Sequence, residues 1–342
     1  MEEMSVPRGS GGSMAEDGAG ATGSAGSIRR ALWRGGAWTK RQISEETGVS
    51  PAMSSLVLNE LARTGEVIGV PRRNGRAGRA GLAYHVDERH APVLCLRVEL
   101  AQGGWLLTGE TVSVLGTVLD RRAETCGEAT PQAVEALARA CLAAHPGTVE
   151  ISLGIPGNIV GEAVLSCDAP ALDGAELLGR LRALGHPLLA FNDAHAMALG
   201  FYREAGDGAQ VVSVAFFPEG VMPGMATVHR GRVLTGASNF AGMLGYVPFA
   251  DDVPGNRALW TGPRGLDLAA RSLAALVAAV NPATILCAGS LVDAGAVERL
   301  AARLADWIPA EHLPRLVYRE DLDSLYRRGL LSPTLERRLG GA

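Results

Sequence analysis

The residue pair Asn192-Asp193 is the strongest candidate for chemistry in this sequence. It follows an apolar, strand-like run at residues 188–191 and precedes an Ala-rich, helix-like segment at 194–200. A strand that ends in Asn-Asp at a helix N-terminus puts a carboxylate where backbone N–H groups are free and the helix dipole favours negative charge. In an α/β protein, ligands bind at this end of a strand. Asp193 is therefore either a ligand contact or a residue that caps the helix.

The composition is that of a globular protein with an ample core. Of the 342 residues, 47% are hydrophobic and 20% are charged, and two or three domains are expected. No apolar run is long enough for a transmembrane helix, and residues 1–27 lack the hydrophobic centre of a secretory signal. The five cysteines are scattered without C-x-x-C spacing. We therefore expect neither a disulfide framework nor a zinc site, and a protein of the reducing cytoplasm.

Charge is distributed unevenly along the chain. Residues 27–86 contain ten Lys and Arg against four Asp and Glu, whereas the whole chain has a net charge of -4. The basic region therefore has a surplus of six positive charges, and the remainder of the chain has an excess of ten negative charges. Opposite signs in adjacent regions indicate two different tasks, with an anionic partner for the basic region.

The basic region has the pattern of a small winged helix-turn-helix domain at residues 27–88. A helix at 27–34 ends at Gly35-Gly36, and Thr39 caps a second helix at 40–47. Ser50 caps a third helix, which has Pro51 in its first turn and ends near residue 63. Strand-like segments at 66–70 and 82–86 then predict a hairpin. Residues 1–26 contain too little apolar surface to fold and are predicted to be a disordered tail, within which Met14 is an alternative start of translation.

The third helix is expected to enter the DNA major groove, where short hydroxyls, apolar contacts and Asn59 would read base edges. The segment at 72–79 alternates arginine with small residues, so it suits a phosphate backbone or a narrow minor groove, although such a loop can also be only a solvated turn. The start of the second helix suits phosphate contacts. The candidate DNA contacts are Lys40, Arg41, Ser50, Ala52, Ser54, Ser55, Asn59, Arg72, Arg73, Arg76 and Arg79.

The remainder of the chain repeats one order of elements. Strands at 93–100, 105–109 and 112–119, a helix at 130–144, a strand at 148–154, a helix at 174–184 and the strand at 188–191 form the first run. Strands at 211–217, 225–229 and 231–235, a helix at 266–280 and a strand at 284–287 form the second. The fold class is therefore α/β, an actin-like ATPase fold behind a winged helix domain. We assign its lobes to 93–195 and 196–320, with a C-terminal segment at 321–342.

Several short motifs together resemble the ROK family, which contains sugar kinases and, with an N-terminal winged helix, sugar-responsive transcription factors. The motifs are Gly-Ile-Pro-Gly at 154–157, Asn-Asp-Ala at 192–194, Gly231 with Gly236, Ala241-Gly242 with Gly245, and Asn-Pro-Ala-Thr-Ile-Leu at 281–286 leading to Gly289. Residues 47–52 and Gly78-Arg79 resemble the regulator branch. The resemblance covers about residues 27–292 and implies an operator-binding protein with a sugar-kinase-like domain.

The departures from this family concern the nucleotide first. The kinases begin with an Asp-x-Gly-Gly-Thr-like phosphate loop, where this chain has Glu-Leu-Ala-Gln-Gly-Gly-Trp at 99–105. Trp105 is too large to follow a glycine pair that must approach a phosphate. The second phosphate loop reads Pro-Glu-Gly-Val-Met-Pro-Gly at 218–224. Proline removes a backbone N–H donor and Glu219 repels phosphate. We therefore expect ATP binding to be lost, and no cofactor.

The sugar and zinc positions of the family are also altered. Met243 and Tyr246 stand where the family has a Glu that binds sugar hydroxyls and a His that contacts sugar or zinc. Residues 251–263 contain no Cys or His, so no metal is expected. The base of the kinases is kept as Asp193, but a base without a phosphoryl donor cannot transfer phosphate. The tentative effector contacts are Gly157, Asn158, Asp168, Asn192 and Asp193.

The sequence thus predicts a transcriptional regulator that is not an enzyme, and most simply a repressor. Its partners would be a double-stranded DNA operator, a sugar-like small-molecule effector and a second copy of the chain, as a homodimer or homotetramer, with no membrane. The alternatives are a ROK-type kinase that phosphorylates hexoses with ATP, and a scaffold whose winged helix contacts proteins. Operator sequence, effector, and repression versus activation stay open.

Overall fold

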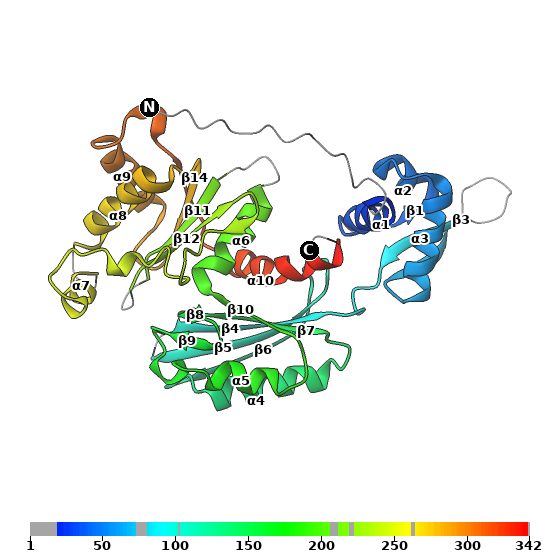
Figure 1. The fold of residues 1–342 in the computed structure, drawn as a ribbon, viewed down its shortest axis with the longest axis horizontal. Coiled ribbons are helices and arrows are strands. Elements are labelled where there is room, and N and C mark those ends of the chain that lie inside the picture. Colours follow the sequence, from blue (N-terminus) through cyan, green and yellow to red (C-terminus); the bar gives the residue numbers. More distant parts are fainter. Residues whose placement is uncertain are drawn as a thin grey trace, which may run out of the picture. The chain divides into compact units, whose positions relative to one another are not determined.

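The chain forms two compact units. The computed structural model describes residues 19–72, 81–101, 103–205, 211–218, 222–260 and 264–340. The smaller unit comprises Met1–Asp87 together with Glu336–Ala342, and the larger unit comprises Glu88–Leu335. In Figure 1 the smaller unit carries the blue helices and the larger unit carries two sheets.

The smaller unit has the element order of a winged helix-turn-helix, as predicted. Thr39 accepts a hydrogen bond from Gln42, and the Gln42 side chain bonds back to the Thr39 N–H, so a capping box begins the second helix. Gly48, in the left-handed conformation, ends that helix, and Ser50 caps the third. The strands pair antiparallel in the order β1-β3-β2. The elements are α1 (Ala19–Leu32), β1 (Trp38–Thr39), α2 (Lys40–Thr47), α3 (Pro51–Arg63), β2 (Val67–Arg72) and β3 (Gly81–Val86).

The first helix begins earlier than predicted, so the disordered tail expected at residues 1–26 cannot extend to residue 26. Helix α1 begins at Ala19 rather than near residue 27, so residues 19–26 are helical. The stabilising contact comes from the far end of the chain. Gly26 lies against the backbone of Leu339, where an added Cβ would collide with the carbonyl oxygen. Arg29 bonds both Glu66, at 2.7 Å, and the Arg338 carbonyl, at 3.5 Å. Residues 1–18 lie outside the described part of the chain.

The larger unit contains two sheets with the same internal order, which confirms the predicted duplication. The first sheet has the order β10-β7-β4-β5-β6 and the second has β13-β12-β11-β14-β15, so each places three antiparallel strands beside two parallel ones. The first sheet comprises β4 (Val93–Ala101), β5 (Gly104–Val112), β6 (Val118–Cys126), β7 (Glu150–Ile155) and β10 (Leu188–Asn192). The second comprises β11 (Val211–Phe216), β12 (Gly224–His229), β13 (Arg232–Val233), β14 (Thr284–Ala288) and β15 (Arg315–Tyr318).

Helices cover both sheets and fill the space between them (Figure 1). One core joins the first sheet to α4 (Pro131–Ala144) and α5 (Glu176–Arg182). Another joins the second sheet to α8 (Gly265–Val280) and α9 (Ala294–Ala305). The middle core surrounds α6 (Asp193–Ala205) and α10 (Asp323–Arg338) and includes residues of both sheets. The remaining elements are β8 (Asn158–Val160), β9 (Ala163–Leu165), α7 (Val253–Trp260) and the 3₁₀ turns at Pro170–Leu172, Leu244–Tyr246 and Ala310–His312.

This layering is that of the actin-like fold, and it shifts two of the predicted boundaries. The limit expected between residues 195 and 196 falls inside α6, which packs on the second sheet from its first turn. The segment at 321–342, predicted without an element, contains α10. No helix in the described part of the chain is long and apolar enough to cross a membrane.

The crossing of α6 and α10 brings two helix backbones into contact. Gly200 of α6 faces the Leu325 carbonyl oxygen, and Gly329 of α10 faces the Ala196 carbonyl oxygen. A Cβ at either glycine would overlap with the opposing backbone, which unlike a side chain cannot rotate away. The two glycines therefore set the separation of the helices.

Gly329→Ala is expected to destabilise the larger unit by about 2–4 kcal/mol, because the added methyl must push two packed helices apart. Gly179→Ala is the matched control, since Gly179 lies in α5 with open space around its Cβ position. That change should stabilise by about 0.5–1 kcal/mol. Urea unfolding followed by circular dichroism measures both. Equal effects of the two changes would contradict the proposed close packing.

Candidate functional site

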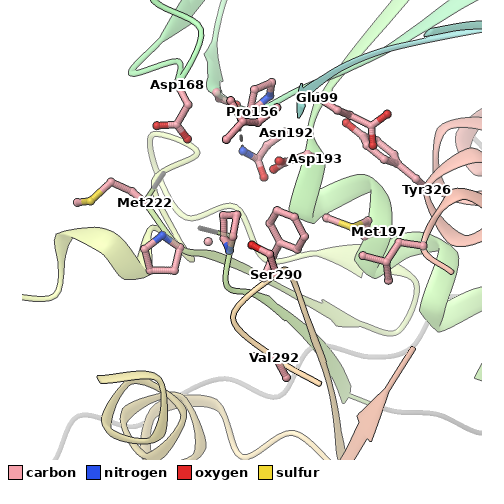
Figure 2. A pocket seen from close by; sticks show the side chains of 18 of the residues that line it. Glu99, Pro156, Asp168, Asn192, Asp193, Met197, Met222, Ser290, Val292 and Tyr326 are labelled. Carbon is pink, nitrogen blue, oxygen red and sulfur yellow. Dashed lines mark hydrogen bonds between the residues drawn. The ribbon is translucent and has the colours of Figure 1, made fainter. Parts of the chain in front are cut away.

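A cavity of about 580 Å³ lies between the two sheets of the larger unit, at the end of β10. Its size is that of a site for a small molecule. Of the five predicted effector contacts, four line it: Gly157, Asp168, Asn192 and Asp193. Figure 2 shows that Asp168, Asn192 and Asp193 extend into the same space.

Asn158 is the exception, because it does not belong to the cavity wall. Its side chain is buried, with 6% of its surface exposed, and its amide donates to the Ser238 carbonyl oxygen at 3.4 Å. Asn158 begins strand β8, so its neighbour Gly157 occupies the cavity wall instead. Asn158 therefore holds a loop of the second half of the chain against the first.

The Asn192-Asp193 pair caps α6 and also lies on the cavity wall. The side-chain oxygens of both residues accept hydrogen bonds from the Ala194 N–H, at 3.0 and 2.7 Å, so both satisfy the start of α6. The Asn192 amide also donates to the Gly157 carbonyl oxygen at 3.1 Å. Asn192 thereby fixes the loop that forms the opposite wall, while the Asp193 carboxyl group still reaches the cavity.

The environment of Asp193 favours its protonated form. Burial raises the pKa of Asp193 to about 7, and the negative charges of Asp168 and Glu99 add to this effect, although the hydrogen bond from Ala194 opposes it. Burial also lowers the pKa of the neighbouring His195 to about 4, so that this histidine is neutral. A carboxyl group near its midpoint at neutral pH responds strongly to a charged ligand.

Tyr326 of α10 is a wall residue that the sequence did not reveal. It is 2% exposed, and its hydroxyl has no hydrogen-bond partner among the described residues. Its ring packs on Gly154, where a Cβ would collide with the hydroxyl, and the Arg97 guanidinium lies 5.4 Å from the ring centre. Burial, together with the charges of Asp193 and Glu99, raises the pKa of Tyr326 well above its usual value, so the phenol stays neutral. In the sequence, Gly154 near a strand end is compatible with close packing by another group, but it does not identify Tyr326 as that group.

The two positions of the expected phosphate loops carry bulky, apolar groups. Leu100 pairs with Trp105 across the tight turn between β4 and β5, and both residues line the cavity. Trp105 is 8% exposed. At the second loop, Pro218 and Pro223 line the same cavity, whereas Glu219 lies outside the described residues. Pro218 and Pro223 have no backbone N–H, so these two residues cannot donate to phosphate as the residues of a glycine-rich loop do.

The sugar-motif positions also reach the cavity. Met243 and Tyr246 both line it, one on each side of Leu244 and Gly245 in a short 3₁₀ turn. The ring of Tyr246 makes an edge contact with Phe240 at 5.1 Å. The wall therefore offers a thioether and a phenol where the family pattern has carboxylate and imidazole.

Metal ligands and reactive thiols do not gather at this site. Within the described ranges, no group of three or more His, Cys, Asp or Glu side chains could hold a metal ion. All five cysteines are free. Burial raises the pKa of Cys95, Cys167 and Cys287 to about 12, so these remain protonated thiols.

In the smaller unit, Ala52 and Asn59 of α3 are exposed as predicted, but Ser54 lies on the buried face of the helix. Ser54 is fully buried and its hydroxyl donates to the Val49 carbonyl oxygen at 3.3 Å, so it is not a DNA contact. Leu56, which was not singled out, is 64% exposed. Ala52, Leu56 and Asn59 follow the helical spacing of four and three residues, and this spacing could have identified Leu56. Ser55 is partly buried, and Ser50 serves as the cap.

Of the predicted cations in the smaller unit, Arg41 and Arg72 are exposed and Lys40 is half-buried. Lys40 donates to the Asn59 side-chain oxygen at 3.0 Å and lies 5.8 Å from the centre of the Tyr84 ring. Arg41 pairs with Glu45, and Arg72 is exposed at the end of β2. Arg73, Arg76 and Arg79 lie outside the described residues.

The fold is that of ROK proteins, both regulators and sugar kinases, which confirms the resemblance at the level of the fold. A ROK family transcriptional regulator, a homologue of the E. coli MLC protein, superimposes with a TM-score of 0.66 at 16% identity, over 94% of this chain and 99% of that one. A ROK family protein from Streptococcus pneumoniae in complex with sucrose superimposes with a TM-score of 0.56 at 16% identity. The ROK hexokinase from Thermus thermophilus superimposes with a TM-score of 0.55 at 17% identity. Each of these two covers 72% of this chain and 99% of its own. No protein-family model and no curated protein match the sequence.

Asp193→Asn is expected to change the pH dependence of stability. A carboxyl whose pKa is raised from 3.8 to about 7 on folding costs stability progressively as the pH rises between these values. The asparagine variant should therefore gain about 1–4 kcal/mol relative to the wild type by about pH 8, with little difference near pH 4. Urea unfolding across this range measures the gain. The surface control Glu298→Gln should show none, and a pH-independent gain at residue 193 would contradict the raised pKa.

Proposed function

We propose that this protein is a transcriptional regulator, most simply a repressor, that binds operator DNA in the cytoplasm through its smaller unit. The observation that carries the proposal is the exposed face of α3 in a winged helix-turn-helix unit with a surplus of six positive charges. A helix presented in this way fits the major groove, and basic flanks supply sequence-independent affinity. The regulator similar to this chain matches across 94% of it, against 72% for the hexokinase, which is additional support.

The exposed face of α3 carries side chains that suit base recognition. In the free protein Lys40 is bonded to Asn59. On DNA, a phosphate would attract Lys40 and release the Asn59 amide to pair with adenine, while Leu56 and Ala52 would meet thymine methyl groups. Two copies of the chain would place two such helices on the half-sites of a palindrome, as a homodimer or a larger assembly.

We further propose that the larger unit senses a ligand and does not transfer phosphate. Trp105, Pro218 and Pro223 occupy the walls on which a nucleotide phosphate would need backbone donors. Asp193 has the position of a general base, but a base without a bound phosphoryl donor has no reaction to assist. A ligand that binds one arrangement of the lobes better than another would shift the population of DNA-binding states.

Removal of the wing arginines tests the DNA interface. Replacing Arg72, Arg73, Arg76 and Arg79 by Ala should lower affinity at least about tenfold and reduce the slope of log K against log salt by about 3–4, because each phosphate contact contributes about one. Fluorescence anisotropy with DNA fragments pulled from the genome by this protein measures both quantities. The charge-matched control replaces four exposed arginines of the larger unit, namely Arg122, Arg139, Arg182 and Arg271. Equal losses in both variants would argue against the wing.

The alternative of a hexose kinase is tested by turnover. A coupled assay for ADP release with ATP and a panel of hexoses should give no rate above the background of protein-free reactions, because Trp105, Pro218 and Pro223 stand at the phosphate-loop positions of the cavity. Sugar-dependent turnover that disappears in Asp193→Ala would establish the kinase and overturn the proposed loss of catalysis. The DNA-binding assay is independent of this result.

A further inference from the structure

The charges on the cavity wall are unbalanced. Among the described residues that line it, one side chain is a cation, Arg319, and this guanidinium pairs with Glu204 outside the cavity at 2.7 Å. None of the described wall residues is Lys or His. The carboxyl groups on the same wall are Glu99, which pairs with the buried Arg97 at 3.5 Å, Asp168, Asp193, Asp293 and Glu320. Such a wall repels phosphates and carboxylates and attracts cations.

A second and independent feature points to a ligand at this place. The Tyr326 hydroxyl is buried, lacks a hydrogen-bond partner within the described part of the chain, and belongs to the cavity wall. Figure 2 shows its ring directed toward Glu99 and Asp193. A buried polar atom without a partner is costly, so a group that supplies one is favoured. An ammonium group has several N–H donors and can serve the phenol oxygen and a carboxylate together.

The remainder of the wall suits the carbon skeleton of an organic cation. The rings of Trp105, Tyr246 and Tyr318 and the thioethers of Met197, Met222 and Met243 line the same cavity. Aromatic faces attract ammonium groups, and methionine packs adaptably around apolar bodies. A neutral sugar would instead need many directed polar partners, and two of the family's sugar positions are Met243 and Tyr246.

We propose that the ligand of this cavity is an organic ammonium ion, an amine on a ring-bearing body of about sugar size, whose ammonium group binds at Asp193 beside Glu99 and Tyr326. The proposal rests on the proposed function, because it names the chemical class of the effector. Selection by charge would let this regulator ignore the neutral hexoses and hexose phosphates that fit a ROK-type fold.

Matched pairs of small molecules test this selection on the full-length protein. 2-Phenylethylamine and 2-phenylethanol differ in one ammonium group, as do glucosamine and glucose, and N-acetylglucosamine and glucose 6-phosphate provide a neutral and an anionic relative. At about pH 6.5, isothermal titration calorimetry and thermal shift should show at least one amine that binds at least tenfold more tightly than its neutral partner. Binding of neither amine, equal binding within both pairs, or preference for the phosphate would overturn the proposal.

Variants locate the binding group. Asp193→Asn keeps an acceptor for the Ala194 N–H but removes the charge, and should abolish the preference for the amine. Asp168→Asn, farther along the wall, should reduce the preference for the amine severalfold. This variant provides a second measurement if Asp193→Asn folds poorly. Glu298→Gln on the exposed face of α9 is the matched control and should leave both affinities unchanged. A full preference retained in both aspartate variants would contradict the assigned position.

DNA binding without any ligand separates this proposal from the proposed function. Amine binding with no affinity for DNA would leave the ligand assignment standing and overturn the regulator. Specific DNA binding with no amine preference would overturn the ligand assignment alone.

Discussion

The contact between the backbones of α6 and α10 determines the arrangement of the larger unit. Gly200 and Gly329 allow the two helices to touch, and no other residue type leaves the necessary space. The helices fill the layer between the sheets, and α10 bonds to the first sheet through the Leu330 carbonyl, which accepts from Ser152 at 2.8 Å. Asp193 is the first residue of α6 and Tyr326 lies in the first turn of α10, so the same crossing also fixes two walls of the cavity.

A cluster of buried charges strengthens this arrangement. Arg97 and Glu110 are each 1% exposed, and both are bonded to α10: Arg97 to Asp323 at 2.8 Å and Glu110 to Arg327 at 3.0 Å. Charges removed from water are tolerated only when partners are present, and loss of one partner leaves an uncompensated ion. The cluster therefore specifies which side of α10 faces the first sheet. The Arg97 guanidinium of this cluster lies 5.4 Å from the centre of the Tyr326 ring, and Tyr326 lines the cavity.

Local sequence signals predicted the parts of the fold that depend on local physics. The cap at Thr39, the cap at Ser50 with Pro51, and the repeated strand order follow from residues close together in the chain. The start of α1 and the whole of α10 were missed, because contacts with distant segments stabilise them. Helix α10 also contains Pro333, which argues against a helix when tertiary packing is unknown.

The candidate site divides in the same way. The Asn192-Asp193 pair was identifiable from its place between a strand and a helix, and the structure puts both residues on the cavity wall. Ser54 was wrongly assigned to the exposed face of α3. It lies two residues after the exposed Ala52, and two residues along a helix place a side chain on nearly the opposite face. Tyr326 could not be predicted as a wall residue, because its contact partner, Gly154, is distant in sequence. A glycine can indicate that another group packs closely against it, but not which group.

The burial of the cysteines has a practical consequence. Thiols held in their protonated form inside a packed interior react slowly with electrophiles and peroxides, since thiolate is the reactive species. Cys167 packs against Gly157 in the cavity loop, whereas Cys287 lies in the second sheet, so the two thiols belong to opposite lobes. The alkylation rate of each thiol would therefore report how often local unfolding exposes it, and the two rates would measure the two lobes separately.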